Sequence, residues 1–183
     1  MRRLLGTAVL ALFTIFAMTN NAAATDPENT LYLELKTGRV VIEMRPDIAP
    51  NHVTRIKELV REKFYDGLLF HRVIEGFMAQ TGDPDGNGTG GSGQNIAAEF
   101  TDLEKFYRGT VGMARARHPN SADSQFFIMF DKAPFLDGQY TIWGEVIDGM
   151  EHVDAIKLGD ETRNGTVDDP DKIITMRVAA DVE

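Results

Sequence analysis

A fixed cation and two side-chain amides stand among large apolar residues in two short segments of this chain. Arg72 and Gln80 belong to residues 70–83, which read FHRVIEGFMAQTGD, and Gln125 belongs to residues 124–128, SQFFI. Apolar residues flank each of them at the period of two that an extended strand requires. A buried polar group without a partner costs ~1–3 kcal/mol. The pattern therefore favours a partly open groove for a mostly apolar, uncharged substrate over a closed core.

Other catalytic groups lack the spacing that their chemistry needs. The chain has no cysteine, and its four histidines are far apart, with no pairs at helical ligand spacing: His52, His71, His118 and His152. A thiolate nucleophile is thereby excluded, and a zinc site has no support. No serine stands in a nucleophile-elbow context. We expect no metal and no cofactor.

The glycine-rich segment at residues 83–91 partly matches two ligand-binding motifs, one for calcium and one for a dinucleotide. Residues 83–88, DPDGNG, begin like a calcium-binding loop, but the twelfth position of such a loop is Gln94 and not the glutamate that chelates the ion. Residues 86–91, GNGTGG, fit a dinucleotide fingerprint outside any strand–helix context. A glycine loop beside the groove is the simpler expectation.

Short strands and two helices must position these residues. Apolar and polar residues alternate over 31–36, a turn is indicated at Thr37-Gly38, and Val40, Ile42 and Met44 share a face of the next strand. Pro50 opens a helix that apolar spacing extends to Phe64, and a second short helix is expected over residues 150–156. Further apolar runs cover residues 69–74, 77–81, 111–114, 126–130, 141–146 and 173–178. Periodicity alone leaves a barrel and a sandwich open.

With a third segment, residues 135–140 (FLDGQY), these stretches resemble the cyclophilins, the peptidyl-prolyl cis-trans isomerases. The similarity runs from about residue 30 to residue 178. It implies a mainly β fold, a closed eight-stranded antiparallel barrel capped by two α-helices. It also implies rotation of X-Pro peptide bonds and help in the folding of exported proteins, with proline-containing unfolded polypeptides as partners.

The resemblance assigns roles residue by residue. It places the catalytic residues at Arg72, Gln80 and Phe77. It places substrate contacts at Met78, Ala114, Arg115, Gln125, Phe127, Phe135, Leu136 and Tyr140. Arg115, Phe135 and Tyr140 replace the asparagine, tryptophan and histidine of many eukaryotic members. Because Phe135 lacks an indole N–H, weak cyclosporin binding is expected.

Composition and net charge limit the kinds of partner that the chain is expected to bind. The 183 residues are 43% apolar and 26% charged, as in an ordinary globular protein of one domain. The net charge of −9 argues against nucleic acid and against anionic membrane surfaces, since both attract basic faces.

The N-terminus has the order of a secretory signal. Arg2 and Arg3 precede an apolar run over residues 4–18, and three alanines end at Ala24. The run is shorter than the ~20 residues that span a bilayer. We therefore expect a signal peptide at 1–24, a polar spacer at 25–29 and an isomerase domain at 30–183.

The signal pattern predicts export to a bacterial periplasm, with no membrane attachment after signal cleavage. We expect the protein to be a monomer. Two other functions remain open from the residues alone. One is a proline-binding chaperone or scaffold that uses the groove without turnover. The other is a structural or adhesion protein of the cell envelope, although no repeat or stalk accompanies the acidic composition.

Overall fold

One antiparallel sheet organises the chain in a computed structural model that describes residues 25–182. Its strands are β1 (Thr30–Leu35), β2 (Gly38–Met44), β3 (Arg72–Ile74), β4 (Met78–Thr81), β5 (Thr110–Met113), β6 (Phe126–Met129), β7 (Ile142–Asp148) and β8 (Thr175–Val178). They lie in the order β3-β4-β6-β5-β7-β2-β1-β8. Strands far apart in sequence, such as β2 and β7, are therefore neighbours in space.

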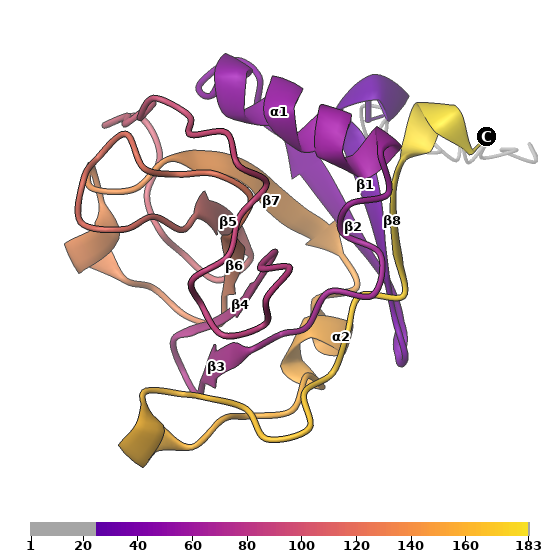
Figure 1. Cartoon of the computed structure of the whole chain (residues 1–183). Helices are drawn as coiled ribbons and strands as arrows, with labels where there is room; N and C mark the ends of the chain where they lie inside the picture. The colour runs from indigo at the N-terminus through magenta and orange to yellow at the C-terminus, as the bar shows by residue number, and fades with distance from the viewer. Residues whose placement is uncertain (1–24, 183) are drawn as a thin grey trace, which may run out of the picture.

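The sheet curls strongly but its ladder does not run all the way round (Figure 1). In the described residues β3 and β8 are the end strands. The segments that precede these two strands are joined by the single bridge Leu69↔Lys172 and by a bond from the Gly67 N–H to the Ile173 carbonyl at 2.8 Å. A second single bridge joins Arg72, the first residue of β3, to Thr166. The prediction of eight antiparallel strands with two helices is confirmed, whereas the barrel is an open, strongly curled sheet.

The first hairpin follows the alternation of its residues. Leu35 pairs with Gly38 across the turn, and Val40, Ile42 and Met44 are all buried. Gly38 has a φ of +149°, and a Cβ there would lie 2.4 Å from the ring of His152. The hairpin can approach the second helix this closely only because residue 38 has no side chain.

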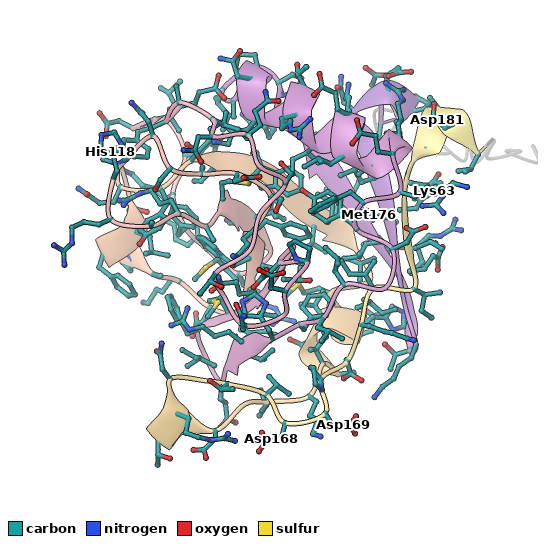
Figure 2. The ribbon with its side chains drawn as sticks, in the orientation of Figure 1. Lys63, His118, Asp168, Asp169, Met176 and Asp181 are labelled. Carbon is teal, nitrogen blue, oxygen red and sulfur yellow. The ribbon has the colours of Figure 1, made fainter. Side chains whose placement is uncertain are left out.

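Two α-helices accompany the sheet: α1 (Pro50–Arg61) runs across its upper end in the view of Figure 1 and α2 (Met150–Asp154) lies near its lower end. Short 3-10 turns cover Pro27–Asn29, Pro134–Leu136, Glu161–Arg163 and Ala179–Asp181. Pro50 occupies the first turn of α1, as predicted. The helix ends before Phe64 because the chain turns at Lys63, whose φ is +59°. Figure 2 labels Lys63 beyond this end.

The interior divides into two apolar clusters. The larger fills the space between α1 and the sheet. The smaller comprises Met78, Phe106, Phe127, Met129, Ala133, Leu136 and Ile142, and Phe77 and Tyr140 lie against it. Several predicted substrate contacts belong to this second cluster, so the same residues form part of the core and support the surface above it.

The lengths and hydropathy of the helices bear on whether the chain could cross a membrane. Between residues 25 and 182, no helix has the length and apolar character required to cross a bilayer. The predicted signal peptide, residues 1–24, lies outside the described residues.

Candidate active site

Strand register brings the predicted polar and aromatic groups together. Arg72 of β3 pairs with Gln80 of β4, and Gln80 pairs in turn with Phe127 of β6. On the far side of β6, Phe127 pairs with Gly112 of β5. Residues that are 8 and 47 positions apart along the chain thus lie side by side on neighbouring strands.

These strands form one wall of a groove of about 560 Å³. The groove is lined by ten of the eleven predicted site residues, Arg72, Phe77, Met78, Gln80, Ala114, Arg115, Phe127, Phe135, Leu136 and Tyr140, and also by Gln139. The eleventh, Gln125, lines an adjoining hollow of about 190 Å³ that shares Gln80, Ala114 and Arg115 with the groove. The structure therefore gathers the predicted set in one place.

Hydrogen bonds between side chains fix the two glutamines. Nη1 of Arg72 donates to Oε1 of Gln80 at 3.1 Å, and Nε2 of Gln80 donates to Oε1 of Gln125 at 2.9 Å. Nε2 of Gln125 then donates to the Gly90 carbonyl at 2.8 Å. The glycine-rich segment thus lies beside the groove and anchors the end of this chain of donors and acceptors.

Asn164 holds the other side of the Arg72 guanidinium. Nε donates to the Asn164 carbonyl at 3.0 Å, and Nη2 donates to Oδ1 at 3.1 Å. The acceptors of Arg72 among the described residues are neutral, and burial lowers the pKa of its guanidinium. Arg72 is thus a positioned cation whose charge no carboxylate contact neutralises.

Asn164 was missed by the sequence analysis. It adopts the left-handed conformation, with a φ of +56°, directly before Gly165. The Asn-Gly pair is a signal for such a turn. Nothing in the sequence indicates that this turn reaches Arg72.

Aromatic rings make the apolar part of the groove. Phe127 stacks on Phe106 with ring centroids 5.8 Å apart and meets Tyr140 edge-on at 5.9 Å. Phe77 lies against Phe135 at 5.5 Å, and Phe135 is 69% exposed. The groove therefore has a buried floor at Phe127 and an aromatic rim at Phe135.

Arg115 follows β5 and folds back over the groove. Its guanidinium carbon lies 4.5 Å from the centroid of the Tyr140 ring. Nη2 donates to the Gln139 carbonyl at 2.9 Å, and Nη1 donates to the Ala116 carbonyl at 2.9 Å. Gln139, the second residue that the sequence analysis missed, thus contributes through its backbone, which a side-chain pattern cannot reveal.

The groove suits binding and polarisation of an uncharged peptide. Its lining supplies two cations, amides and aromatic surface, and includes no carboxylate, histidine, serine or cysteine. Across residues 25–182, no group of three or more histidine, cysteine, aspartate or glutamate side chains is placed to hold a metal ion. His71, beside Arg72, is buried, and burial lowers its pKa.

A curled antiparallel sheet bearing an apolar, arginine-lined groove agrees with what the resemblance to the cyclophilins predicts. Residues 30–178 match the family described as cyclophilin type peptidyl-prolyl cis-trans isomerase/CLD. This chain belongs to the cyclophilin-type peptidyl-prolyl cis-trans isomerase family.

Two proteins of similar sequence support this family assignment. The chain is 54% identical over 194 residues to a probable peptidyl-prolyl cis-trans isomerase of Brucella suis biovar 1, a match that covers 100% of this chain and 98% of the relative. It is 42% identical over 136 residues to a peptidyl-prolyl cis-trans isomerase of Helicobacter pylori, covering 72% of this chain and 83% of that protein.

Solved structures share the fold. The cyclophilin AquaCyp293 from Hirschia baltica superimposes with a TM-score of 0.76 at 28% identity, over 87% of this chain and 77% of that one. A cyclophilin type isomerase from Cryptosporidium parvum, crystallised in the presence of the dipeptide Ala-Pro, gives a TM-score of 0.75 at 29% identity, over 81% of this chain and 98% of that one.

Proposed function

We propose that the groove catalyses rotation about X-Pro bonds with Arg72 as the principal catalytic group. The observation that carries this proposal is the Arg72 guanidinium, held beside an apolar pocket by the neutral acceptors Gln80 and Asn164. The proline ring would rest on an apolar set of lining residues: Phe77, Met78, Phe127, Leu136 and Tyr140. The Cryptosporidium relative crystallised with Ala-Pro supports a proline-containing ligand for this groove.

The chemistry requires weakening of amide conjugation. Rotation about a peptide C–N bond meets a barrier of ~18–20 kcal/mol because the nitrogen lone pair is delocalised into the carbonyl. In the twisted transition state that lone pair is localised on a pyramidal nitrogen, which accepts a hydrogen bond more strongly than a planar amide does. An Arg72 N–H directed at the prolyl nitrogen would therefore bind the transition state more tightly than the ground state.

The glutamines have an orienting role in this proposal. Gln80 would direct its amide toward the carbonyl that precedes proline, and Gln125 would hold Gln80 through the 2.9 Å bond between their side chains. The backbone at Ala114 and Arg115 would anchor the substrate chain beside them. Because the surroundings are apolar, each such hydrogen bond is worth more than it would be in water. No nucleophile, acid, base or metal takes part.

The first test measures cis-trans exchange in a short Ala-Pro peptide by NMR, with the chain from Thr25 onward and its Arg72→Ala variant. Fast exchange that the variant loses supports the proposal. Binding of the peptide without faster exchange contradicts it and favours a proline-binding chaperone or scaffold. An unchanged rate in the variant would remove Arg72 from the mechanism.

We further propose that the protein is exported and assists the folding of other exported proteins as a monomer in a bacterial periplasm. The N-terminal order of paired arginines, apolar run and small residues supports this assignment. N-terminal sequencing of the protein recovered from a periplasmic extract is the test. A chain beginning near Thr25 supports the proposal, and a full-length chain in the cytoplasmic fraction contradicts it.

A further inference from the structure

Three hollows meet at Gln80 and Arg115. Beside the groove and the smaller hollow near Gln125, a third hollow of about 470 Å³ extends past Arg72 to Asn164. Both Gln80 and Arg115 line all three. A peptide whose proline occupies the groove has these hollows beside its flanking residues.

The arginines of this region differ from the others in their partners. Seven of the ten arginines among residues 25–182 form ion pairs within 4.0 Å of a carboxylate: Arg39, Arg45, Arg55, Arg61, Arg108, Arg163 and Arg177. The three without an ion pair in this part of the chain are Arg72, Arg115 and Arg117. Arg72 and Arg115 line the groove, and Arg117 is exposed two residues further on.

Acidic side chains are nearly absent from the same surface. The linings of the three hollows include a single carboxylate, that of Asp123. It accepts hydrogen bonds from the Ser92 N–H at 2.7 Å, the Ser92 hydroxyl, the Gly93 N–H at 2.9 Å and the Gln94 N–H at 3.1 Å. The Asp123 carboxylate is therefore already occupied by four donors.

The charge of the groove is opposite in sign to the net charge of the chain. The sequence has 28 acidic and 19 basic residues, yet the groove presents two arginines and no acid. Asp168 and Asp169 project at the lower edge of the molecule and Asp181 lies at its upper right (Figure 2). A concave surface of one sign focuses its electrostatic field on the ligand that enters it.

Arg115 is the cation best placed to select a ligand. Its guanidinium lies along the Tyr140 ring and donates to main-chain carbonyls, so its position is defined while its charge is not neutralised. Arg72 is committed to Gln80 and Asn164 and to the reacting bond. Four of its five N–H groups donate to the Gln139, Ala116 and Arg117 carbonyls, so a carboxylate near Arg115 would meet a fixed positive charge and the one remaining N–H of Nη2.

We propose that the groove selects proline segments that carry an aspartate or glutamate in the residues flanking the proline, and that Arg115 is the residue that reads this charge. The inference rests on the proposed function only in placing the client's proline in the groove. It specifies the client class: acidic proline-containing segments, with basic flanks disfavoured by repulsion.

The test compares peptides that differ only in one residue, Ala, Glu or Lys, placed in turn at each position near the proline. Binding is measured by calorimetry at low and at high salt, and cis-trans exchange is measured on the same samples. We expect the best-placed Glu to bind about fivefold more tightly than Ala and Lys to bind more weakly than Ala. The difference should shrink at high salt, which screens charges.

Matched variants locate the effect. Arg115→Gln should bind the Glu and Ala peptides with equal affinity, whereas Arg115→Lys, which keeps the charge, should retain part of the preference. Arg39→Gln is the control, since it removes the same charge from the distant β1–β2 hairpin, where Arg39 pairs with Glu34 at 2.6 Å. It should keep the full preference. Thermal unfolding of each variant establishes that it is folded.

The outcomes separate the two proposals. Equal affinity of the wild-type protein for all peptides overturns the charge preference, as does a preference that survives in Arg115→Gln. Absence of accelerated exchange with every peptide overturns the isomerase mechanism. A Glu preference in binding would still uphold the client class in that case.

Discussion

Asn164 holds Arg72 by two hydrogen bonds across 92 residues of sequence, one from its carbonyl and one from its side-chain Oδ1. The turn that carries Asn164 lies outside the sheet. The bond from the Val73 N–H to the Gly165 carbonyl, at 2.8 Å, ties this turn to β3. The direction of the Arg72 guanidinium is therefore set, together with Gln80, by a turn that contributes none of the predicted site residues.

Replacing Asn164 by glycine should slow turnover about tenfold with little loss of stability. Glycine adopts the φ of +56° readily and keeps the carbonyl that accepts from Nε, but it removes Oδ1. A misdirected catalytic group lowers the rate without abolishing binding. Exchange kinetics and thermal unfolding check this, and wild-type kinetics in Asn164→Gly would show that Oδ1 has no positioning role.

Removing the Arg72 guanidinium should have a larger effect. We expect Arg72→Ala to lower turnover by about two orders of magnitude, the loss typical of one preorganised donor at a transition state. Arg72→Lys should recover little, because a single ammonium cannot reach Gln80 and Asn164 as the planar guanidinium does. Peptide affinity should change far less than the rate, so a parallel loss of both would contradict a transition-state role.

Gly112 lies against the ring of Phe127, the buried floor of the groove. A Cβ at this position would come within 2.5 Å of the Phe127 ring and 2.6 Å of the Phe106 ring. Gly112→Ala should therefore lower the free energy of unfolding by about 1–3 kcal/mol through overpacking and should weaken peptide binding by displacing Phe127.

The control for that substitution is Gly144→Ala on β7, where a Cβ would lie 3.0 Å from the Glu43 carbonyl oxygen and from the Ile42 side chain, away from the groove lining. It should reduce stability while leaving peptide affinity unchanged. Urea unfolding and peptide titration measure both quantities. Equal affinities in all three proteins would mean that Phe127 tolerates the added methyl group.

Stability should fall as the pH is lowered from neutrality. His52 is fully buried, and burial lowers its pKa below the ordinary 6.5, although Glu99 accepts from Nδ1 at 2.6 Å. The unfolded chain therefore binds a proton more readily below about pH 6.5 than the folded protein does, which favours unfolding. His71, whose pKa burial also lowers, acts in the same direction.

Glu99 extends this dependence to lower pH. Burial opposes ionisation of Glu99, but bonds from the His52 ring and from the Asn51 and His52 N–H groups hold its pKa below the ordinary 4.5. Its contribution is present above pH 4.5 and is lost as the pH falls through its folded value. Denaturant unfolding between pH 7.5 and 4 should show the decline, and His52→Asn should flatten its upper part; an unchanged profile in the variant would exclude His52.

Phe135 should limit the binding of cyclosporin. The resemblance predicts weak binding because a phenyl ring has no N–H to donate, and Phe135 is an exposed rim residue packed on Phe77. Phe135→Trp should tighten binding about fivefold, the value of one added hydrogen bond. A fluorescence or calorimetric titration measures this, and equal affinities would assign the weakness to another residue.

Sequence reasoning identified most of the strands and helices and most of the residues that line the groove, because both follow from local patterns. The alternation in β1 and β2 and the proline that opens α1 were sufficient to place those elements. The end of α1 was not predicted correctly, since apolar spacing continues to Phe64 while the backbone turns at Lys63. Closure of the barrel depends on how far each strand pairs with its neighbour, which no single segment encodes.

The types and order of the groove residues are properties of the sequence, and the family resemblance needed nothing more. Only the tertiary structure decided that Asn164 directs Arg72, that the Gln139 carbonyl holds Arg115, and that acidic side chains are excluded from the groove lining. Each of these depends on a main-chain contact or a charge distribution created by strands and turns from distant parts of the chain. Such contacts leave no periodic pattern in sequence, because their geometry exists only once the sheet has curled.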